Sequence, residues 1–258
     1  MAELDLWWGP PLLMALLIGG LCPTAGSLLI TQRRILLANL MAHSVLPGLV
    51  LAIVFELEPS LGGLVSGLIG ALVAERLSQR FRGREEGAIN TVLAGFTALG
   101  VLLVPLLQVR VDLESLLFGD ILAAGAPDLV RTAVAAAALL LLLVARYQDL
   151  VFIGVDPEGA LAAKRPVSQI RFITIVVTAL VVISAITAVG IVLVIGLLCA
   201  PVLLHVERST SLQNLMLKSA GTGLLLCGGG MLLAMLWDLP PGPLIGVLCT
   251  GLLMLRRA

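Results

Sequence analysis

Asn39 and His43 are the residues best suited to chemistry in this sequence, within the stretch QRRILLANLMAHSVLPG at 32–48. Residues four apart share one face of a helix, so the amide oxygen of Asn39 and a ring nitrogen of His43 can converge on one point. Pro47 has no N–H to offer the carbonyl of His43, which leaves that oxygen as a further ligand nearby. Inside a bilayer, polar side chains beside an unsatisfied backbone group usually mark a substrate path. The stretch therefore predicts a cation path; the alternative is that His43 bonds a neighbouring helix and Pro47 only kinks the segment.

The chain around this stretch has the composition of a membrane protein. Of its 258 residues, 59% are hydrophobic and 12% are charged, where about 25% charged residues is usual in a globular domain. A spanning helix needs about 20 apolar residues. We expect an all-α polytopic fold of eight or nine transmembrane helices in a single domain, 1–258, because 169–205 reads as two crossings or as one crossing and a re-entrant piece. The apolar windows are 8–31, 36–54, 60–76, 88–108, 129–146, 169–187, 190–205, 216–236 and 241–255.

The distribution of charge favours nine crossings, with the N-terminus outside and the C-terminus in the cytosol. In that topology Arg110 and Arg131 are the only two of the 16 Lys and Arg residues on the outer side, as the positive-inside rule predicts. The start, MAELDLWW, lacks the basic region and cleavage site of a signal peptide, so we expect the first helix to be retained.

A second informative stretch, FIGVDPEGALAAKRPV at 152–167, predicts a short helix on the inner surface. Asp156 suits the N-cap, Pro157 the first helical position and Glu158 the positive end of the helix dipole, and Pro166 ends the segment. A short, small-sided helix at about 156–166 suits insertion into a cleft on a cytosolic partner. A purely structural inner loop is the alternative.

The acidic residues of the segment VRVDLESLLFGDILAAG at 109–125 are a weaker candidate site. We expect an amphipathic or partly re-entrant outer piece whose carboxylates, Asp112, Glu114 and Asp120, line the outer mouth and concentrate a cation, or are simply solvated. The four cysteines fall within predicted spans without paired spacing, which indicates packing roles.

The sequence offers no means of using ATP by itself. A phosphate-binding P-loop ends in Gly-Lys-Ser/Thr, whereas Lys164 follows Ala163 and Lys218 follows Leu217. Neither a Ser/His/Asp constellation nor an HExxH pattern is present, so we do not expect an enzyme. A membrane cation site with an inner docking helix points to a transporter whose ATP hydrolysis occurs on a separate subunit.

These motifs together resemble the permease subunits of ATP-binding cassette importers for manganese, zinc and iron(II). Of the family pattern RRMxxxGDALAHSVLPGV, the chain has Arg33-Arg34-Ile35 and then 42–48, while LLFGDILA is present at 116–123 and DPExAxxxGxPV is matched at 156–167. VGxLLVxALLxxPA is similar to 189–202 and LPAGP to 239–243. The resemblance covers nearly the whole chain, with several separate motifs in the same order.

The resemblance implies a set of partners. These are a cytosolic ATP-binding subunit, an extracytoplasmic metal-binding protein and a second permease copy in a homodimer, all at the lipid bilayer of a prokaryotic plasma membrane. The metal ion is the transported solute; no covalently bound cofactor and no nucleic acid are expected. Two copies would bring two Asn39 and two His43 side chains to one axis. The residues implied to couple to the ATPase are Asp156, Pro157, Glu158, Ala160, Lys164 and Pro166.

Three positions depart from the family pattern. Asn39 replaces the usual aspartate, which removes a charge from the expected metal site. Lys164 stands at the position of a glycine, and Gly159 stands where an aromatic residue is common.

The sequence leaves more than one candidate for the transported ion and for the source of energy. Amide oxygen and imidazole without thiolate favour manganese over zinc or iron(II). The rival from another class is an ion-coupled secondary transporter or a channel without an ATPase. Such proteins commonly place carboxylates at mid-membrane, and no Asp or Glu lies deep in a predicted span.

Overall fold

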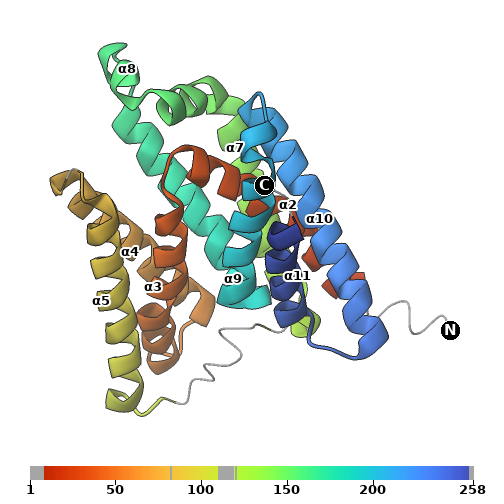
Figure 1. Ribbon diagram of the computed structural model, residues 1–258. Helices are drawn as coiled ribbons and strands as arrows, with labels where there is room; N and C mark the ends of the chain where they lie inside the picture. The colour runs from red at the N-terminus through yellow and green to blue at the C-terminus, as the bar shows by residue number, and fades with distance from the viewer. Residues whose placement is uncertain (1–8, 82, 110–118, 120, 256–258) are drawn as a thin grey trace.

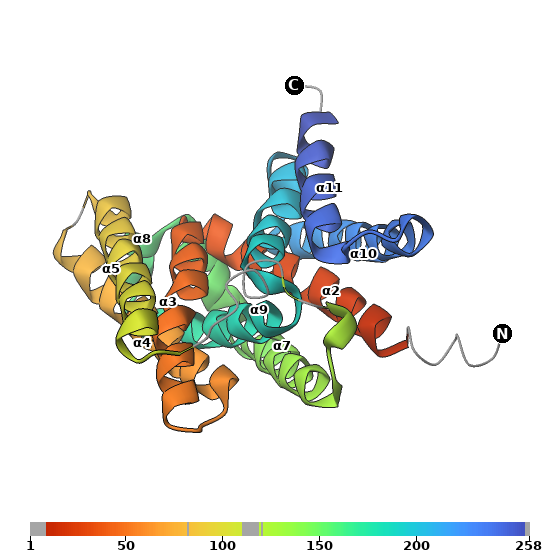
Figure 2. The same ribbon diagram turned by 90° about the horizontal axis from the view of Figure 1, so that it is seen from below.

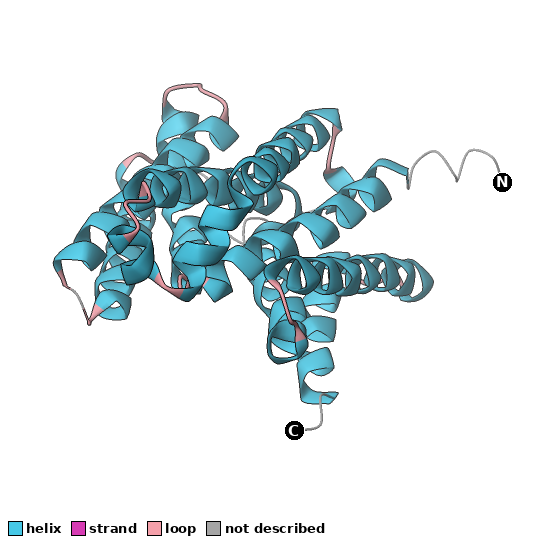
Figure 3. Cartoon of the chain, turned by 90° about the horizontal axis from the view of Figure 1, so that it is seen from above, coloured by secondary structure: helices cyan, strands magenta, loops and turns pink. Residues whose placement is uncertain are grey.

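The computed structural model describes residues 9–81, 83–109, 119 and 121–255 and is all-helical over these residues (Figures 1 and 3). The long helices run back and forth between two ends of the molecule, and the short helix α8 marks one of these ends (Figure 1). The elements are α2 (Gly9–Thr31), α3 (Ile35–Val54), α4 (Pro59–Arg80), α5 (Glu85–Leu106), η1 (Ile121–Ala123), α7 (Ala126–Val155), α8 (Pro157–Ala162), α9 (Val167–His205), η2 (Val206–Arg208), α10 (Leu212–Trp237) and α11 (Pro241–Leu255).

Seven of the described helices are long and apolar enough to cross a membrane, and α11 is a shorter apolar helix. The 39-residue α9 would be about 58 Å long if straight, roughly twice the apolar thickness of a bilayer. Its helical geometry breaks at Gly190 (φ 79°, ψ 165°), a conformation essentially restricted to glycine. Counting the two arms of α9 separately gives nine apolar helical segments in the described chain, within the predicted range of eight to nine.

The two arms of α9 turn back on each other, so that both ends of the helix lie beside the last turns of α7 (Figure 1). At the start of α9, Arg165 Nη1 lies 3.1 Å from Asp149 Oδ1 of α7. At its end, Val206 lines the same cavity as Val151 and Val155 of α7. Viewed from below, α9 lies amid α2, α3, α7, α10 and α11, which makes it the centre of the core (Figure 2).

Hydroxyl groups within the apolar helices bond to the preceding turn. The hydroxyls of Thr24, Ser27, Thr174 and Thr178 donate to carbonyl oxygens four residues earlier at 2.7–2.8 Å. Because the apolar core of a bilayer offers no water, these bonds let polar side chains sit in spanning helices at low cost.

Three helix boundaries differ from the sequence prediction. α4 continues through Arg80, where the sequence predicted a loop after 76, because ERLSQR is composed of good helix formers. α7 has non-helical backbone angles at Arg146, the predicted end, but resumes to Val155 because its last turns bury Leu150 and Ile153. The inner helix α8 is shorter than predicted, at Pro157–Ala162.

A reciprocal backbone contact between two glycines joins α3 to α4. A Cβ atom on Gly48 would collide with the carbonyl oxygen of Gly62, and one on Gly62 would collide with the carbonyl oxygen of Gly48. Glycines at such positions let two helix backbones approach closely. This contact fixes the position of α3, the helix that carries Asn39 and His43.

We predict that Gly62→Ala lowers the stability of the protein by about 1–3 kcal/mol, because the added methyl group forces α3 and α4 apart. Gly95→Ala on α5 is the matched control, since a Cβ atom there meets no atom within 4 Å; it should be neutral or slightly stabilising, as Ala favours helix over Gly. Unfolding in mixed micelles of mild detergent and sodium dodecyl sulfate would measure both. Equal effects of the two substitutions would show that the α3–α4 contact is not tightly packed.

Candidate functional site

Asn39 and His43 lie on one stripe of α3 that the neighbouring helices leave partly uncovered. Both residues are partly exposed, whereas Ala38, Leu40 and Met41 beside them are buried. Within the part of the chain that the structure describes, no hydrogen bond engages either side chain. The amide of Asn39 and the imidazole of His43 are therefore available to bind a ligand.

Packing against α4 and α5 determines which part of α3 stays uncovered. Gly100 of α5 lies against Leu46 and Pro47, one turn beyond His43. On another face, the hydroxyl of Ser66 in α4 donates to the carbonyl oxygen of Ser44 at 2.6 Å. These contacts cover α3 near Ser44, Leu46 and Pro47, whereas Asn39 and His43 stay partly exposed.

An ion pair fastens the beginning of α3 to α4. Arg34, the residue before the first turn of α3, pairs through Nη1 with Oε2 of Glu75, which is only 8% exposed. Gln79 donates from Nε2 to the other carboxylate oxygen at 3.0 Å. Both oxygens of this buried carboxylate thus have partners, and Asn39 lies five residues along from the anchored arginine.

The described residues of one chain do not form a complete metal site. No group of three or more His, Cys, Asp or Glu side chains within the described ranges could hold a metal ion. Asn39 and His43 stay candidate ligands on one helix, and within the described ranges they belong to no such group.

Four of the six predicted coupling residues, Asp156, Pro157, Glu158 and Ala160, lie in the short helix α8 or at its N-cap. The Asp156 side chain accepts a hydrogen bond from the backbone N–H of Gly159 at 2.8 Å, and Pro157 occupies the first turn, as predicted. Ala160 is fully buried, whereas Glu158 is exposed. The backbone N–H of Gly159 is therefore satisfied by the cap, and the cap and the buried alanine fix how α8 sits on the fold.

The departure at Lys164 falls on a turn with an unusual backbone. Lys164 has φ 54°, the left-handed region that favours glycine, which is the residue of the family pattern at this position. Pro166 follows at the N-cap position of α9. The chain adopts the turn that the pattern implies even though its residue type is less suited to it.

Sequence reasoning missed two buried carboxylates, Glu75 and Asp149. Asp149 lies 3.1 Å from Arg165 and 3.6 Å from Arg146, so it ties α7 to the segment that follows α8. The available signal was an acidic residue among apolar ones, with arginines three residues away on one side and in the next loop on the other.

The carboxylates proposed for the outer mouth, Asp112, Glu114 and Asp120, lie outside the described residues. Gly119 of the same segment is described, and it packs against the backbone of Val189 and Gly190 at the turn of α9. The role of the three carboxylates stays a prediction.

A comparison with protein families matches residues 9–257 to the ABC 3 transport family. The chain belongs to this family. Membership in the ABC 3 transport family confirms the resemblance drawn from the motifs and the polytopic helical fold expected from the composition.

The relatives of this chain include proteins named for two different metals. A manganese transport system membrane protein, MntC of Halalkalibacterium halodurans, is 29% identical over 93% of this chain and 83% of its own length. A probable iron transport system membrane protein of Haemophilus influenzae is 25% identical over 96% of this chain and 91% of its own length. The solved structure of PsaBC from Streptococcus pneumoniae in complex with Fab superposes with a TM-score of 0.84 at 25% identity, covering 96% of this chain and 90% of that chain.

We predict that Glu75→Gln destabilises this ABC 3 family protein by on the order of 3 kcal/mol, because it leaves the charge of Arg34 without its carboxylate. Combining it with Arg34→Gln should restore part of the loss, since the double variant buries no unpaired charge. Unfolding in mixed micelles gives the double-mutant cycle, with Arg80→Gln, an exposed charge on the same helix, as the control expected to stay within about 0.5 kcal/mol of the unmodified protein. Simple additivity of the two substitutions would contradict a coupled pair.

Proposed function

We propose that this protein is the membrane permease subunit of an ATP-driven importer of divalent metal ions, with manganese the preferred ion. The observation that carries the proposal is the pair Asn39 and His43, two metal-ligating side chains left uncommitted on a partly uncovered face of a membrane-spanning helix. Ionisable residues within a membrane are expensive and usually functional. A relative named for manganese and one named for iron support a metal as the solute.

The ion path is formed by two copies of the chain. One copy offers an amide oxygen and an imidazole nitrogen, and metal ions of this class take four to six ligands. A second copy that faces the first along the stripe of Asn39 and His43 brings two oxygens and two nitrogens to one axis. Oxygen and imidazole ligands without thiolate suit Mn(II).

The α8 end of the molecule faces the cytosol in this proposal. The charges at that end support it, because they include Arg34, Arg76, Arg165 and Arg171, and cytoplasmic loops carry an excess of Lys and Arg. The N-terminus then lies outside, and nine crossings place the C-terminus in the cytosol.

ATP hydrolysis takes place on a separate subunit that binds α8. The exposed carboxylates Asp156 and Glu158 and the exposed Lys164 offer it polar contacts, while buried Ala160 holds α8 to the permease. An extracytoplasmic metal-binding protein delivers the ion at the opposite end.

The buried carboxylates argue against an ion-coupled secondary transporter. Coupling to protons or sodium commonly uses carboxylates that are free to change charge in mid-membrane. Among the described residues the buried acidic side chains are Glu75 and Asp149, and both are paired with arginines near the α8 end. Energy from a partner ATPase fits this pattern better.

We expect His43→Ala to reduce metal uptake by about tenfold or more, since loss of even an indirect metal contact costs about 10–100-fold in affinity. Cells that express the permease with its ATPase would be assayed for uptake of manganese, zinc and iron separately. Asn90→Ala, which removes an exposed amide from α5, is the control and should leave uptake unchanged. Normal uptake by His43→Ala, with normal assembly, would remove this residue from the path.

Asn39→Asp should tighten manganese use, because a hard divalent ion gains from an ionised carboxylate. The measurement is the manganese concentration that gives half-maximal uptake, which should fall. An unchanged value for manganese, zinc and iron alike would argue against convergence of residues 39 and 43 on the ion.

Asp156→Ala should reduce ATP-dependent uptake several-fold, because loss of an N-cap costs about 1 kcal/mol of helix stability and α8 is only one to two turns long. Asp156→Asn is the matched variant, since an amide oxygen caps a helix as well as a carboxylate does. We expect near-normal uptake from Asn and reduced uptake and weaker co-purification of the ATPase from Ala. Equal loss from both variants would mean that the charge, and not the cap, matters to the partner.

A further inference from the structure

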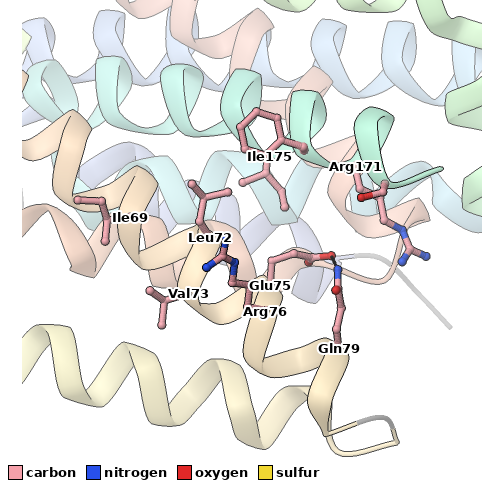
Figure 4. A pocket seen from close by; sticks show the side chains of 10 residues that line it. Ile69, Leu72, Val73, Glu75, Arg76, Gln79, Arg171 and Ile175 are labelled. Carbon is pink, nitrogen blue, oxygen red and sulfur yellow. Dashed lines mark hydrogen bonds between the residues drawn. The ribbon is translucent and has the colours of Figure 1, made fainter. Parts of the chain in front are cut away.

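A cleft of about 420 Å³ opens between α4 and the first turns of α9, away from the stripe of Asn39 and His43. Of its polar side chains, Glu75, Gln79 and Arg171 lie toward the end of the cleft where α4 leads into α5, and the guanidinium of Arg76 points back beside Leu72 (Figure 4). Ile69 and Val73 lie farther from that end (Figure 4). The cleft therefore has a polar end and an apolar end.

The apolar end continues a row of exposed side chains along α4. Leu61, Val65, Ile69 and Val73 recur every fourth residue and are all exposed, and Phe172 of α9 is exposed across the cleft. From Leu61 to Val73 the row extends about 18 Å, close to half of a hydrocarbon core about 30 Å thick. A row of this length and composition suits contact with one acyl chain in one leaflet.

The polar end carries two guanidinium groups, and within the described ranges one of them, that of Arg76, has no partner. Arg76 follows Val73 by three residues on the same side of α4, and it has no ion pair or hydrogen bond within the described ranges. The nearby carboxylate of Glu75 is already engaged by Arg34 and Gln79. Arg171 of α9 adds a second guanidinium at the edge of the cleft.

We propose that this cleft binds one anionic phospholipid of the cytoplasmic leaflet. Its phosphate contacts Arg76 and Arg171, since guanidinium groups are suited to phosphate, and an acyl chain follows the row from Val73 to Leu61. Basic pockets between transmembrane helices on the cytoplasmic side bind lipid headgroups by the same chemistry. The apolar row favours a lipid over an acidic segment of a soluble partner, which would leave these side chains uncovered.

The test measures lipid retained by the purified, delipidated full-length chain in detergent, by native mass spectrometry during titration with phosphatidylglycerol. Affinity should fall about fivefold for Arg76→Gln or Arg171→Gln and about thirtyfold for the double variant. Arg80→Gln removes the same charge from the same helix but does not line the cleft, so its affinity should change less than twofold. Val73→Trp keeps every charge, fills the apolar end and should also weaken binding.

Competing ligands separate a lipid from other anions. Phosphatidylcholine should bind much more weakly than phosphatidylglycerol, and inorganic phosphate in excess should not displace the lipid, because it lacks the acyl chain. Equal affinity of wild type and double variant, or equal loss from Arg80→Gln, would overturn the proposal. Displacement by inorganic phosphate, with Val73→Trp binding normally, would replace it with a simple anion site. The assay reads lipid alone, so its result is independent of whether the chain transports metal.

Discussion

The backbone contact between Gly48 and Gly62 is the constraint on which the rest of the candidate site depends. No side chain separates α3 from α4 at this point, and the carbonyl oxygen of each glycine lies against the Cα of the other. The contact lies just after His43 and Pro47 along α3. Such proximity leaves α3 little freedom to rotate, because rotation would drive Val45 or Ser44 into the small-residue face of α4. The orientation of Asn39 and His43 is thus set by the residues opposite them on the helix, and not by bonds of their own.

Ion pairs also hold α3 and α7 in place. Arg34 and Glu75 hold the start of α3, and Asp149, with Arg146 and Arg165, holds the end of α7 and the segment that follows α8. Both clusters bury a carboxylate near the α8 end, where loss of hydration is expensive unless an arginine compensates. The candidate ion path and the candidate coupling helix are therefore each attached to the bundle through a buried carboxylate.

Much of this arrangement follows from local sequence, and the rest depends on pairings between distant residues. Hydropathy located the spans, and the cap of α8 followed from Asp156 and Pro157, because these signals act within a few residues. The continuation of α7 past Arg146 was missed because tertiary burial of Leu150 and Ile153 outweighs a boundary that charge alone suggests. Glu75 was missed because its partner lies 41 residues away in sequence. The same-face relation of Asn39 and His43 was predictable, but their partial exposure depends on how the neighbouring helices pack against α3.

The reversal at Gly190 gives α9 a mechanical property that a simple crossing helix lacks. Its first arm starts directly after α8, runs the length of the bundle and ends against Gly119, at the far end of the molecule. A helix is stiff along its axis over this distance, so a push or tilt applied at one end of the arm arrives at the other with little loss. The second arm runs back toward the side on which the first began and packs against α2, α10 and α11. One hinge residue thus links the two ends of the molecule through a single continuous element.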